Sequence, residues 1–388
     1  GKYHKDALLQ AMASFEKLRP PAPTGAAKKK RDVTDDDRKF AEAADLYGQL
    51  LPDDKDIITV IYKNGQFFYD YGDYDEAIKR FGLILERYPA SPVAAAAGDK
   101  LLQCLAEAKD YENIETWARR LKKTKAFAAR EEQDRLDKLI VQSMMKAGET
   151  LAAKKEYGKA AAHYRNVARE YPGHAQAAKA LANAGAAYEQ AGQPQEAVEA
   201  YEALAEKYPK ASEAPDGLFV AAKIEESVAA YARAALLYEQ VAKNWPQHQH
   251  AAASLRNAGI LRQTLGQHDK AAGLYADYEQ RYRGRGEARD VHFQRGLLLA
   301  ERKDWKGAAG VFADFVKANP QDERVVEAHV REAEAHLALG ADGKAKEALA
   351  RALAAYKTAK RGDDAQVFAA QARYLQGELL FREYDRIK

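Results

Sequence analysis

The chain is 388 residues long and carries 61 basic and 58 acidic side chains, which leaves a formal net charge of +3 at pH 7. That length exceeds one ordinary globular domain, and so balanced a charge does not point to a nucleic-acid partner. The single cysteine, Cys104, excludes an internal disulfide bond. No apolar run approaches the roughly 18 residues needed to cross a bilayer, so we expect no membrane span. Because the sequence begins with Gly1 rather than Met, we expect an excised fragment or a mature form.

Two helices and a linker are predicted before the regular part of the chain. Residues 1–18 predict an amphipathic N-terminal helix, because apolar side chains recur at helical spacing, at Leu8, Leu9, Met12, Phe15 and Leu18. Residues 19–35 are rich in Pro, Ala and Lys, which is typical of a flexible linker. We expect the acidic residues 35–37 largely to cancel the basic run at 28–31. A further helix is predicted over 36–51, ending at Pro52.

From residue 36 to residue 358 the same letters return every 37 residues, which indicates a repeat array. The period is marked by Pro52, Pro89, Pro172, Pro209, Pro246 and Pro320. A small residue recurs in step at Ala77, Ala160, Ala197, Ala234, Ala271, Ala308 and Ala345. An aromatic residue follows the small residue by four positions, at Phe81, Tyr164, Tyr201, Tyr238, Tyr275 and Phe312. A glycine precedes the small residue by twelve positions, at Gly65, Gly148, Gly185, Gly259 and Gly296. Nine additional residues interrupt the period near 121–135, where we expect one helix to run long.

Each unit of the array is predicted to be two helices joined by a short turn. Apolar residues recur at intervals of three and four residues over 174–191. Gly192 then ends the helix in a left-handed conformation, which glycine adopts at low energetic cost. Pro194 suits the first turn of the second helix, and Pro209 ends it. A lone hairpin cannot bury both of its apolar faces, whereas neighbours in one register can. The sequence therefore predicts about eight stacked helix pairs.

These letters resemble the tetratricopeptide repeat, whose pattern is Leu-Gly-x-x-Tyr, then Ala, an aromatic residue four positions on, and Pro. Residues 181–209 match it at Gly185, Tyr188, Ala197, Tyr201 and Pro209. The unit at 252–283 departs from the pattern with Arg262 in place of Tyr. The unit at 95–126 is degenerate, with Ile114 and Ala118 at the Ala and aromatic positions. The resemblance covers about 40–384 and implies an all-α fold, a right-handed α-solenoid of stacked helical hairpins. It leaves 359–388 as a C-terminal capping helix or the start of a truncated further repeat.

The length of the unit suggests a subtype of the family. Units of 37 residues with additional residues after Tyr-Pro resemble bacterial envelope members, such as outer-membrane assembly lipoproteins, the Tol–Pal coordinator and large gliding-motility envelope proteins. The resemblance implies a periplasmic or outer-membrane-associated location. A cytoplasmic bacterial array with longer loops is the alternative.

The sequence predicts no catalytic residue, no cofactor and no metal site. His248 and His250 share one loop, but neither a carboxylate nor a thiol accompanies them in the sequence. His329 and His336 share a helix face, where packing or groove lining is the expected role. Cys104 lies in an apolar helix and is expected to be inert core. We therefore expect a protein that is not an enzyme.

One basic run remains, at 119–125. It suits phosphates or lipid headgroups, but cations at a helix C-terminus are also favoured by the helix dipole alone.

The resemblance also implies that the first helices of the units line a concave groove that binds a protein or peptide. Its groove-facing places fall on Tyr62, Gln66, Tyr69, Asp216, Phe219, Lys223, Arg256, Ile260, Asp290, Phe293 and Val330. Exposed rings there would suit a peptide or helix; alternatively the rings pack against the following helix. The functional expectation is a non-catalytic interaction scaffold in a bacterial cell-envelope complex. Two alternatives stay open, namely a recognition arm of a larger enzyme and self-association through the repeat ends.

Overall fold

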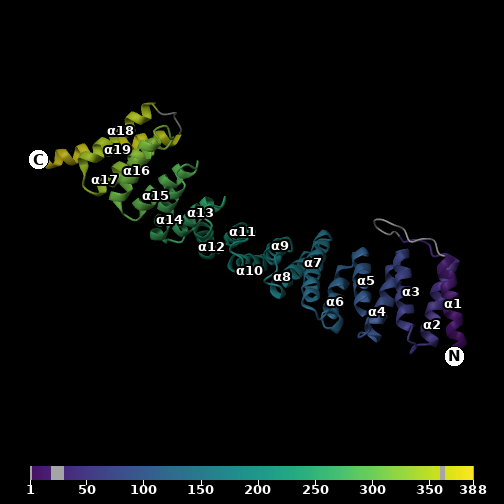
Figure 1. Ribbon diagram of the computed structural model, residues 1–388. Coiled ribbons are helices and arrows are strands. Elements are labelled where there is room, and N and C mark those ends of the chain that lie inside the picture. The colour runs from purple at the N-terminus through teal and green to yellow at the C-terminus, as the bar shows by residue number, and fades with distance from the viewer. Residues whose placement is uncertain (1, 19–29, 359–362, 388) are drawn as a thin grey trace. The chain divides into compact units, whose positions relative to one another are not determined.

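The computed structural model describes residues 2–18, 30–358 and 363–387, and these ranges form helices without a strand. The predicted all-α fold is confirmed (Figure 1). The chain divides into two compact units, unit 1 over 1–192 and unit 2 over 193–388. The division lies inside the predicted array. Most of the predicted linker, residues 19–29, lies outside the described ranges, and so do residues 359–362.

Unit 1 is a succession of helices in which each α-helix packs on the next α-helix. They are α1 (Lys2–Leu18), α2 (Asp35–Leu50), α3 (Ile57–Tyr71), α4 (Tyr74–Arg87), α5 (Ala94–Glu107), α6 (Tyr111–Leu121), the 3₁₀ helix η1 (Lys125–Phe127), α7 (Arg130–Ala153), α8 (Tyr157–Glu170) and α9 (Ala177–Gln190). No described helix of the chain is both long enough and apolar enough to cross a membrane.

Unit 2 has the same organisation. Its helices are α10 (Pro194–Lys207), α11 (Glu213–Ser227), α12 (Tyr231–Asn244), α13 (Ala251–Thr264), α14 (His268–Arg281), α15 (Ala288–Glu301), α16 (Trp305–Ala318), α17 (Val325–Ala338), α18 (Asp342–Thr358) and α19 (Asp363–Ile387). The last helix, α19, packs on both α17 and α18.

A contact between a glycine of the first helix and a ring of the second holds the two helices of a hairpin together. A Cβ atom added to Gly259 would lie 2.5 Å from Cε1 of Tyr275, and one added to Gly296 would lie 2.7 Å from Cε1 of Phe312. Both rings are buried. The same contact occurs in unit 1, where a Cβ atom on Gly65 would lie 2.8 Å from Phe81. Glycine is therefore the residue that lets a ring lie close against the backbone of the first helix.

The nine additional residues near 121–135 do more than lengthen a helix. The expected long helix is α7, with 24 residues, but the insertion also forms η1, which the sequence did not predict. Phe127 of η1 is buried, and a Cβ atom on Gly98 would lie 2.8 Å from its ring. Helix α6 has the small Ala118 at the usual ring position. The insertion thus supplies a ring to the unit that lacks one.

The turn between paired helices is periodic in its backbone. The residue with a left-handed conformation recurs at Gly72, Lys109, Lys155, Gly192, Ala229, Gly266, Lys303 and Gly340. The sequence predicts this conformation at Gly192, where φ is +70°. Four of the eight positions hold Lys or Ala, so the geometry of the turn is kept even where the side chain makes it unfavourable.

The aromatic residue that ends a second helix contacts the preceding repeat. The Tyr88 hydroxyl donates to the Pro52 carbonyl at 3.0 Å, and the Tyr282 hydroxyl donates to the Pro246 carbonyl at 2.8 Å. Nε1 of Trp245 donates to the Pro209 carbonyl at 2.9 Å. Each accepting carbonyl belongs to the proline just after a helix of the preceding repeat, so this hydrogen bond fixes one repeat to the next.

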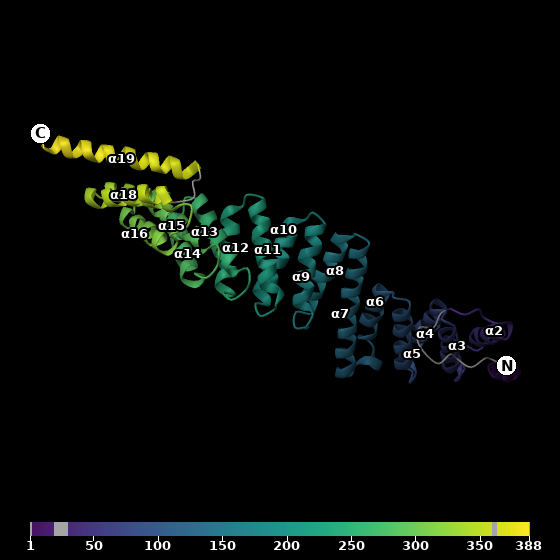
Figure 2. The same ribbon diagram turned by 90° about the horizontal axis from the view of Figure 1, so that it is seen from above.

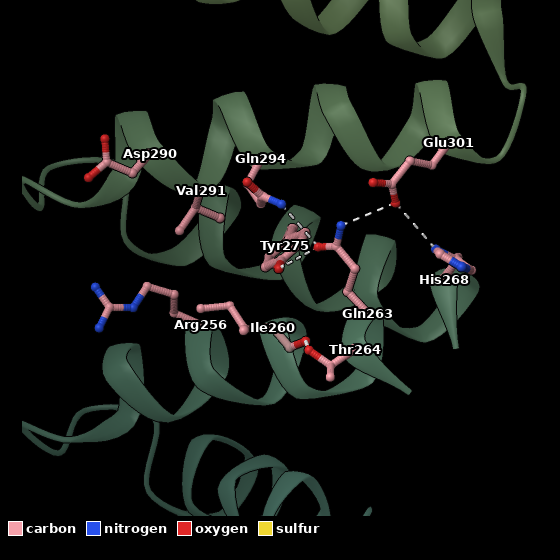
Figure 3. A pocket seen from close by; sticks show the side chains of 10 residues that line it. All are labelled: Arg256, Ile260, Gln263, Thr264, His268, Tyr275, Asp290, Val291, Gln294 and Glu301. Carbon is pink, nitrogen blue, oxygen red and sulfur yellow. Dashed lines mark hydrogen bonds and ion pairs between the residues drawn. The ribbon is translucent and has the colours of Figure 1, made fainter. Parts of the chain in front are cut away.

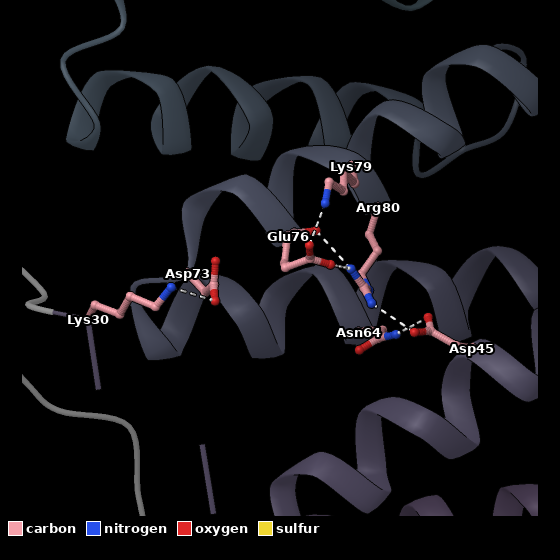
Figure 4. A network of polar contacts seen from close by, with 7 residues as sticks. All are labelled: Lys30, Asp45, Asn64, Asp73, Glu76, Lys79 and Arg80. Carbon is pink, nitrogen blue, oxygen red and sulfur yellow. Dashed lines mark hydrogen bonds and ion pairs between the residues drawn. The ribbon is translucent and has the colours of Figure 1, made fainter. Parts of the chain in front are cut away.

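Polar contacts join the first helices of unit 1 (Figure 4). Arg80 of α4 pairs with Glu76 at 2.6 Å and with Asp45 of α2 at 2.8 Å. Lys30 of the basic run pairs with Asp73 at 3.1 Å rather than with the acidic residues 35–37. Asp37 is buried and accepts a hydrogen bond from Tyr71 instead.

The turn geometry predicts opposite effects for two glycines of one hairpin. Gly266→Ala should lower the free energy of unfolding by about 1 kcal/mol, because φ is +69° at this position. Gly273→Ala, in the interior of α14 with no atom within 4 Å of the added Cβ, should raise it by up to about 1 kcal/mol. Urea unfolding of both variants measures the difference, and equal effects would contradict this explanation of the turn.

The glycine–ring contact predicts a second and larger loss of stability. Gly259→Ala should destabilise the protein by about 1–3 kcal/mol, because the Tyr275 ring leaves no room for a methyl group. Gly310→Ala is the matched control, since its Cβ would meet no atom within 4 Å on α16. Thermal unfolding followed by circular dichroism gives both values. A Gly259→Ala protein as stable as the control would show that the ring moves aside freely.

Candidate partner-binding groove

A hollow of about 630 Å³ lies in unit 2, formed by α13, α14 and α15 (Figure 3). Its size falls within the range of sites that hold small molecules or single side chains of a partner. Three of the predicted groove residues come together here: Arg256 and Ile260 from α13, and Asp290 from α15. Figure 3 places Arg256 and Asp290 at one end and His268 and Glu301 at the other.

A line of polar side chains runs through the middle of the hollow. Gln263 accepts hydrogen bonds at Oε1 from Gln294, at 3.2 Å, and from the Tyr275 hydroxyl, at 3.1 Å. Its amide nitrogen donates to Glu301 at 3.2 Å, and His268 lies 3.7 Å from the same carboxylate oxygen. Sequence reasoning missed these residues. Helical spacing was the available signal, because Gln263 follows Arg256 by seven positions and Gln294 follows Asp290 by four.

Tyr275 is a hydrogen-bond donor rather than an acid–base group. Burial, with a smaller effect from the negative charge of Glu301, raises the pKa of its hydroxyl to about 12. The hydroxyl therefore stays protonated at neutral pH and orients Gln263. The polar line is a fixed floor against which a ligand could dock.

Asp290 is held by Arg324, the residue that precedes α17. The Arg324 guanidinium binds Asp290 at 2.8 Å and Asp322 at 2.9 Å. It also lies over the Phe293 ring, 5.0 Å from the centroid. The hydrogen bond from the Arg324 guanidinium holds the pKa of the Asp322 carboxyl below its usual range.

Two predicted groove residues of unit 2 line the core and not the surface. Phe293 is 5% exposed and packs edge-on against Phe312 and Phe315, and Val330 is fully buried. For these two positions the alternative is correct, that the side chain packs against neighbouring helices. The spacing of a helix shows which side a residue faces, but not how far the next helix covers it.

Arg256 differs from its arginine neighbours. Arg262 pairs with Glu239, and Arg295 pairs with Glu279, both at 2.6 Å. Within the described part of the chain Arg256 has no ion pair, and its half-buried side chain carries an Nε atom without a hydrogen-bond partner. Ile260, one turn away, is 46% exposed. A cation without a counter-ion beside an exposed apolar side chain is an arrangement that a ligand could complete.

The predicted residues on α11 form a separate cluster. Asp216 lies 3.2 Å from Nε2 of His250 and 3.5 Å from Nε2 of His248. The Phe219 ring stacks on His250, with centroids 4.1 Å apart, while Lys223 is exposed. The two histidines are thus engaged with a carboxylate and a ring. Among the described residues no group of three His, Cys, Asp or Glu is placed to hold a metal ion.

The predicted residues in unit 1 lie on α3. Tyr62 is half-buried against Phe81, and Gln66 donates to Asp70 at 2.9 Å. Tyr69 is buried, with the Lys100 ammonium over its ring at 4.5 Å. Tyr69 therefore follows the alternative of a packed ring, as Phe293 does.

The other groups that the sequence singled out, namely Cys104, His329 and part of the basic run at 119–125, are buried or paired within the fold. Burial raises the pKa of the Cys104 thiol to about 12, so it is uncharged at neutral pH. His329 contacts the buried Glu332 at 3.2 Å. In the basic run at 119–125, Arg119 pairs with Glu170 at 2.6 Å, and Lys122 pairs with Asp137. These contacts favour a structural role for the run over a phosphate or lipid site.

Within each unit the helices pack each on the next and are joined by repeated turns, which defines the class of helical-repeat proteins, the α-solenoids. Two sequence models, both described as tetratricopeptide repeat, match residues 142–174 and 179–211 and residues 256–323. Over these residues the chain matches the tetratricopeptide repeat. Proteins with this repeat are generally non-catalytic scaffolds that bind proteins or peptides.

Solved structures similar to the chain share little sequence with it. One is YrrB, titled "a TPR protein with an unusual peptide-binding site", with 16% identity, coverage of 54% of this chain and 97% of that chain, and a TM-score of 0.37. Another is MamA from Desulfovibrio magneticus RS-1, with 15% identity, coverage of 47% and 97%, and a TM-score of 0.32. No curated protein matches the chain. The two repeat models, and not these overall scores, identify the repeat.

The contact between Asp322 and Arg324 predicts a pH-dependent stability. Asp322→Asn should lower the free energy of unfolding by about 1–2 kcal/mol at pH 7, because it removes the charge from a carboxylate that accepts three hydrogen bonds from Arg324. A carboxyl whose pKa is lowered on folding stabilises the protein above its unfolded pKa of about 3.9 and ceases to do so as the pH falls through the folded pKa. The deficit of the variant should therefore shrink toward pH 3.

Urea unfolding at several pH values from 7 to 3 measures that deficit. Asp314→Asn, at an exposed position of α16, is the control and should change stability by less than about 0.5 kcal/mol at every pH. A deficit of constant size over the whole range would contradict the assigned role of the carboxylate.

Proposed function

We propose that the chain is a non-catalytic scaffold that binds a segment of a partner protein in the groove of α13, α14 and α15. The observation that carries this proposal is Arg256, a half-buried cation without an ion pair among the described residues, on the rim of a hollow of about 630 Å³. Desolvating a charge without a counter-ion is costly, so an acidic group from a partner would improve the environment of this guanidinium.

The rest of the groove defines the shape of the ligand. Ile260 supplies exposed apolar surface beside Arg256, and the buried Val291 also lines the hollow. Gln263 and Gln294 supply amide groups farther along. Glu301 and His268 stand at the opposite end. The ligand that fits is a short peptide segment with an acidic side chain near Arg256 and an apolar side chain over Ile260.

The cellular setting belongs to the same proposal. The 37-residue unit and the additional residues after Tyr-Pro resemble bacterial envelope members of the family, which supports a periplasmic or outer-membrane complex as the place of action. The parent gene tests this point, because a signal peptide or lipobox encoded upstream of Gly1 is expected, and its absence would favour the cytoplasm.

Selection from a random peptide library displayed on phage tests the groove. Selected peptides should share one Asp or Glu close in sequence to an apolar residue. Arg256→Ala should weaken their binding by about 1.5–3 kcal/mol, the range for a hydrogen bond to a charged group. Isothermal titration calorimetry gives the affinities.

Lys270→Ala is the matched control, because it removes an exposed cation of α14 that does not line the groove. Ile260→Ser should also weaken binding, since it removes the apolar contact. Peptides that bind Arg256→Ala and wild-type protein equally well would exclude this groove as the recognition site.

A further inference from the structure

Helix α19 is apolar on two opposite faces. One face packs on α17 and α18 through Ala369, Ala372 and Leu379, all nearly or fully buried. The other face carries side chains that are between 57% and 67% exposed, namely Val367, Tyr374, Leu380, Phe381 and Tyr384. In Figure 2, α19 is the outermost helix of unit 2, with α18 on its inner side. Exposed apolar surface of this extent is uncommon in monomeric proteins and marks an interaction site.

The exposed residues follow a regular spacing. Val367, Ala370, Tyr374, Gly377 and Phe381 succeed one another at intervals of three, four, three and four, the heptad spacing of helices that pair side by side. Large and small residues alternate along this stripe. The missing side chain of Gly377 leaves open space, because an added Cβ atom would meet no described atom within 4 Å.

We propose that two copies of the chain dimerise through this stripe, with their α19 helices antiparallel. Tyr374 and Gly377 are equally distant from the midpoint between 375 and 376, and so are Ala370 and Phe381. A two-fold axis at that midpoint places each Tyr374 ring against Gly377 of the second copy and each Phe381 ring against Ala370 of the second copy. Each large residue then meets a small one, as close packing requires.

The same kind of contact already holds the hairpins of unit 2 together. Gly259 and Gly296 each receive a ring from the following helix. Ala370 lies 74 residues after Gly296, two periods along the same series, on a face that no described helix covers. A ring from a second copy would occupy at Ala370 the place that Tyr275 and Phe312 occupy at the two glycines.

The area of the stripe is sufficient for a dimer. An aromatic side chain presents roughly 150–250 Å², so three rings and two aliphatic side chains, each about three-fifths exposed, offer on the order of 600 Å² per copy. Two copies would bury about 1,200 Å², which reaches the lower end of the range for specific protein interfaces. A weak to moderate, concentration-dependent dimer is the expected form.

Sedimentation equilibrium of the full 388-residue chain tests the proposal. The wild type should change from monomer to dimer with increasing concentration. Tyr374→Arg and Phe381→Glu should each raise the dimer dissociation constant by about 100-fold or more, because each change occurs twice in a symmetric interface. Arg382→Glu, an exposed position of α19 outside the stripe, is the charge-changing control and should leave the constant within a few-fold.

Circular dichroism distinguishes a lost interface from a lost fold, since all three variants should keep wild-type helicity. A chain that stays monomeric at high concentration would overturn the proposal. A dimer that persists in both Tyr374→Arg and Phe381→Glu would do the same, because it would use another surface.

The orientation of the helices has its own measurement. In the antiparallel arrangement, the exposed Gln366 lies level with Asp385 of the second copy, so spin labels on Gln366→Cys in the two copies should be about 28 Å apart along the axis. Cys104 is fully buried, which confines labelling to the introduced cysteine. A parallel pair would bring the labels within about 15 Å of each other and would contradict the proposed two-fold axis. Peptide binding at the α13–α15 groove should be unchanged in Tyr374→Arg, so the two proposals can fail separately.

Discussion

The close approach of the two helices in a hairpin determines most other features of the structure. In four described hairpins a ring of the second helix lies against a glycine of the first, at a distance that excludes a methyl group; the glycines are Gly65, Gly148, Gly259 and Gly296. This contact sets the spacing of the helix pair, and the spacing decides which side chains of the next pair are covered. The groove residues inherit their positions from it, since Tyr275 both fills the space beside Gly259 and orients Gln263.

Two further devices keep the hairpins in register within each unit. The left-handed turn residue fixes the angle between the paired helices, whether it is Gly, Lys or Ala. The aromatic residue before the proline donates to a proline carbonyl of the preceding repeat, as Tyr282 does to Pro246. These local contacts repeat along the chain, so the fold requires no contact between distant segments. A binding surface can therefore vary without changing the framework.

The sequence predicted the framework because helix ends, turns and core contacts depend on neighbouring residues, and a 37-residue period repeats them. It could not predict that Phe127 supplies the ring missing at Ala118, because that ring arrives from an insertion outside the period. It also could not predict that Phe293 and Val330 are covered while Arg256 and Ile260 are not. Coverage depends on how far the next helix extends across a face, and helical spacing carries no information about that distance.

Most arginines near the groove belong to the framework and not to the binding surface. Arg262, Arg295 and Arg324 are each held by a carboxylate within unit 2, so they stabilise the stack and are not free to recognise a ligand.

The close packing of ring and glycine is measured by a double-mutant cycle. The free energy of unfolding is determined for Gly259→Ala, for Tyr275→Leu and for both changes together. We expect the smaller side chain to accommodate the methyl group, so that the two losses fall short of additivity by about 1 kcal/mol or more. Simple additivity would show that the ring and the glycine do not constrain each other.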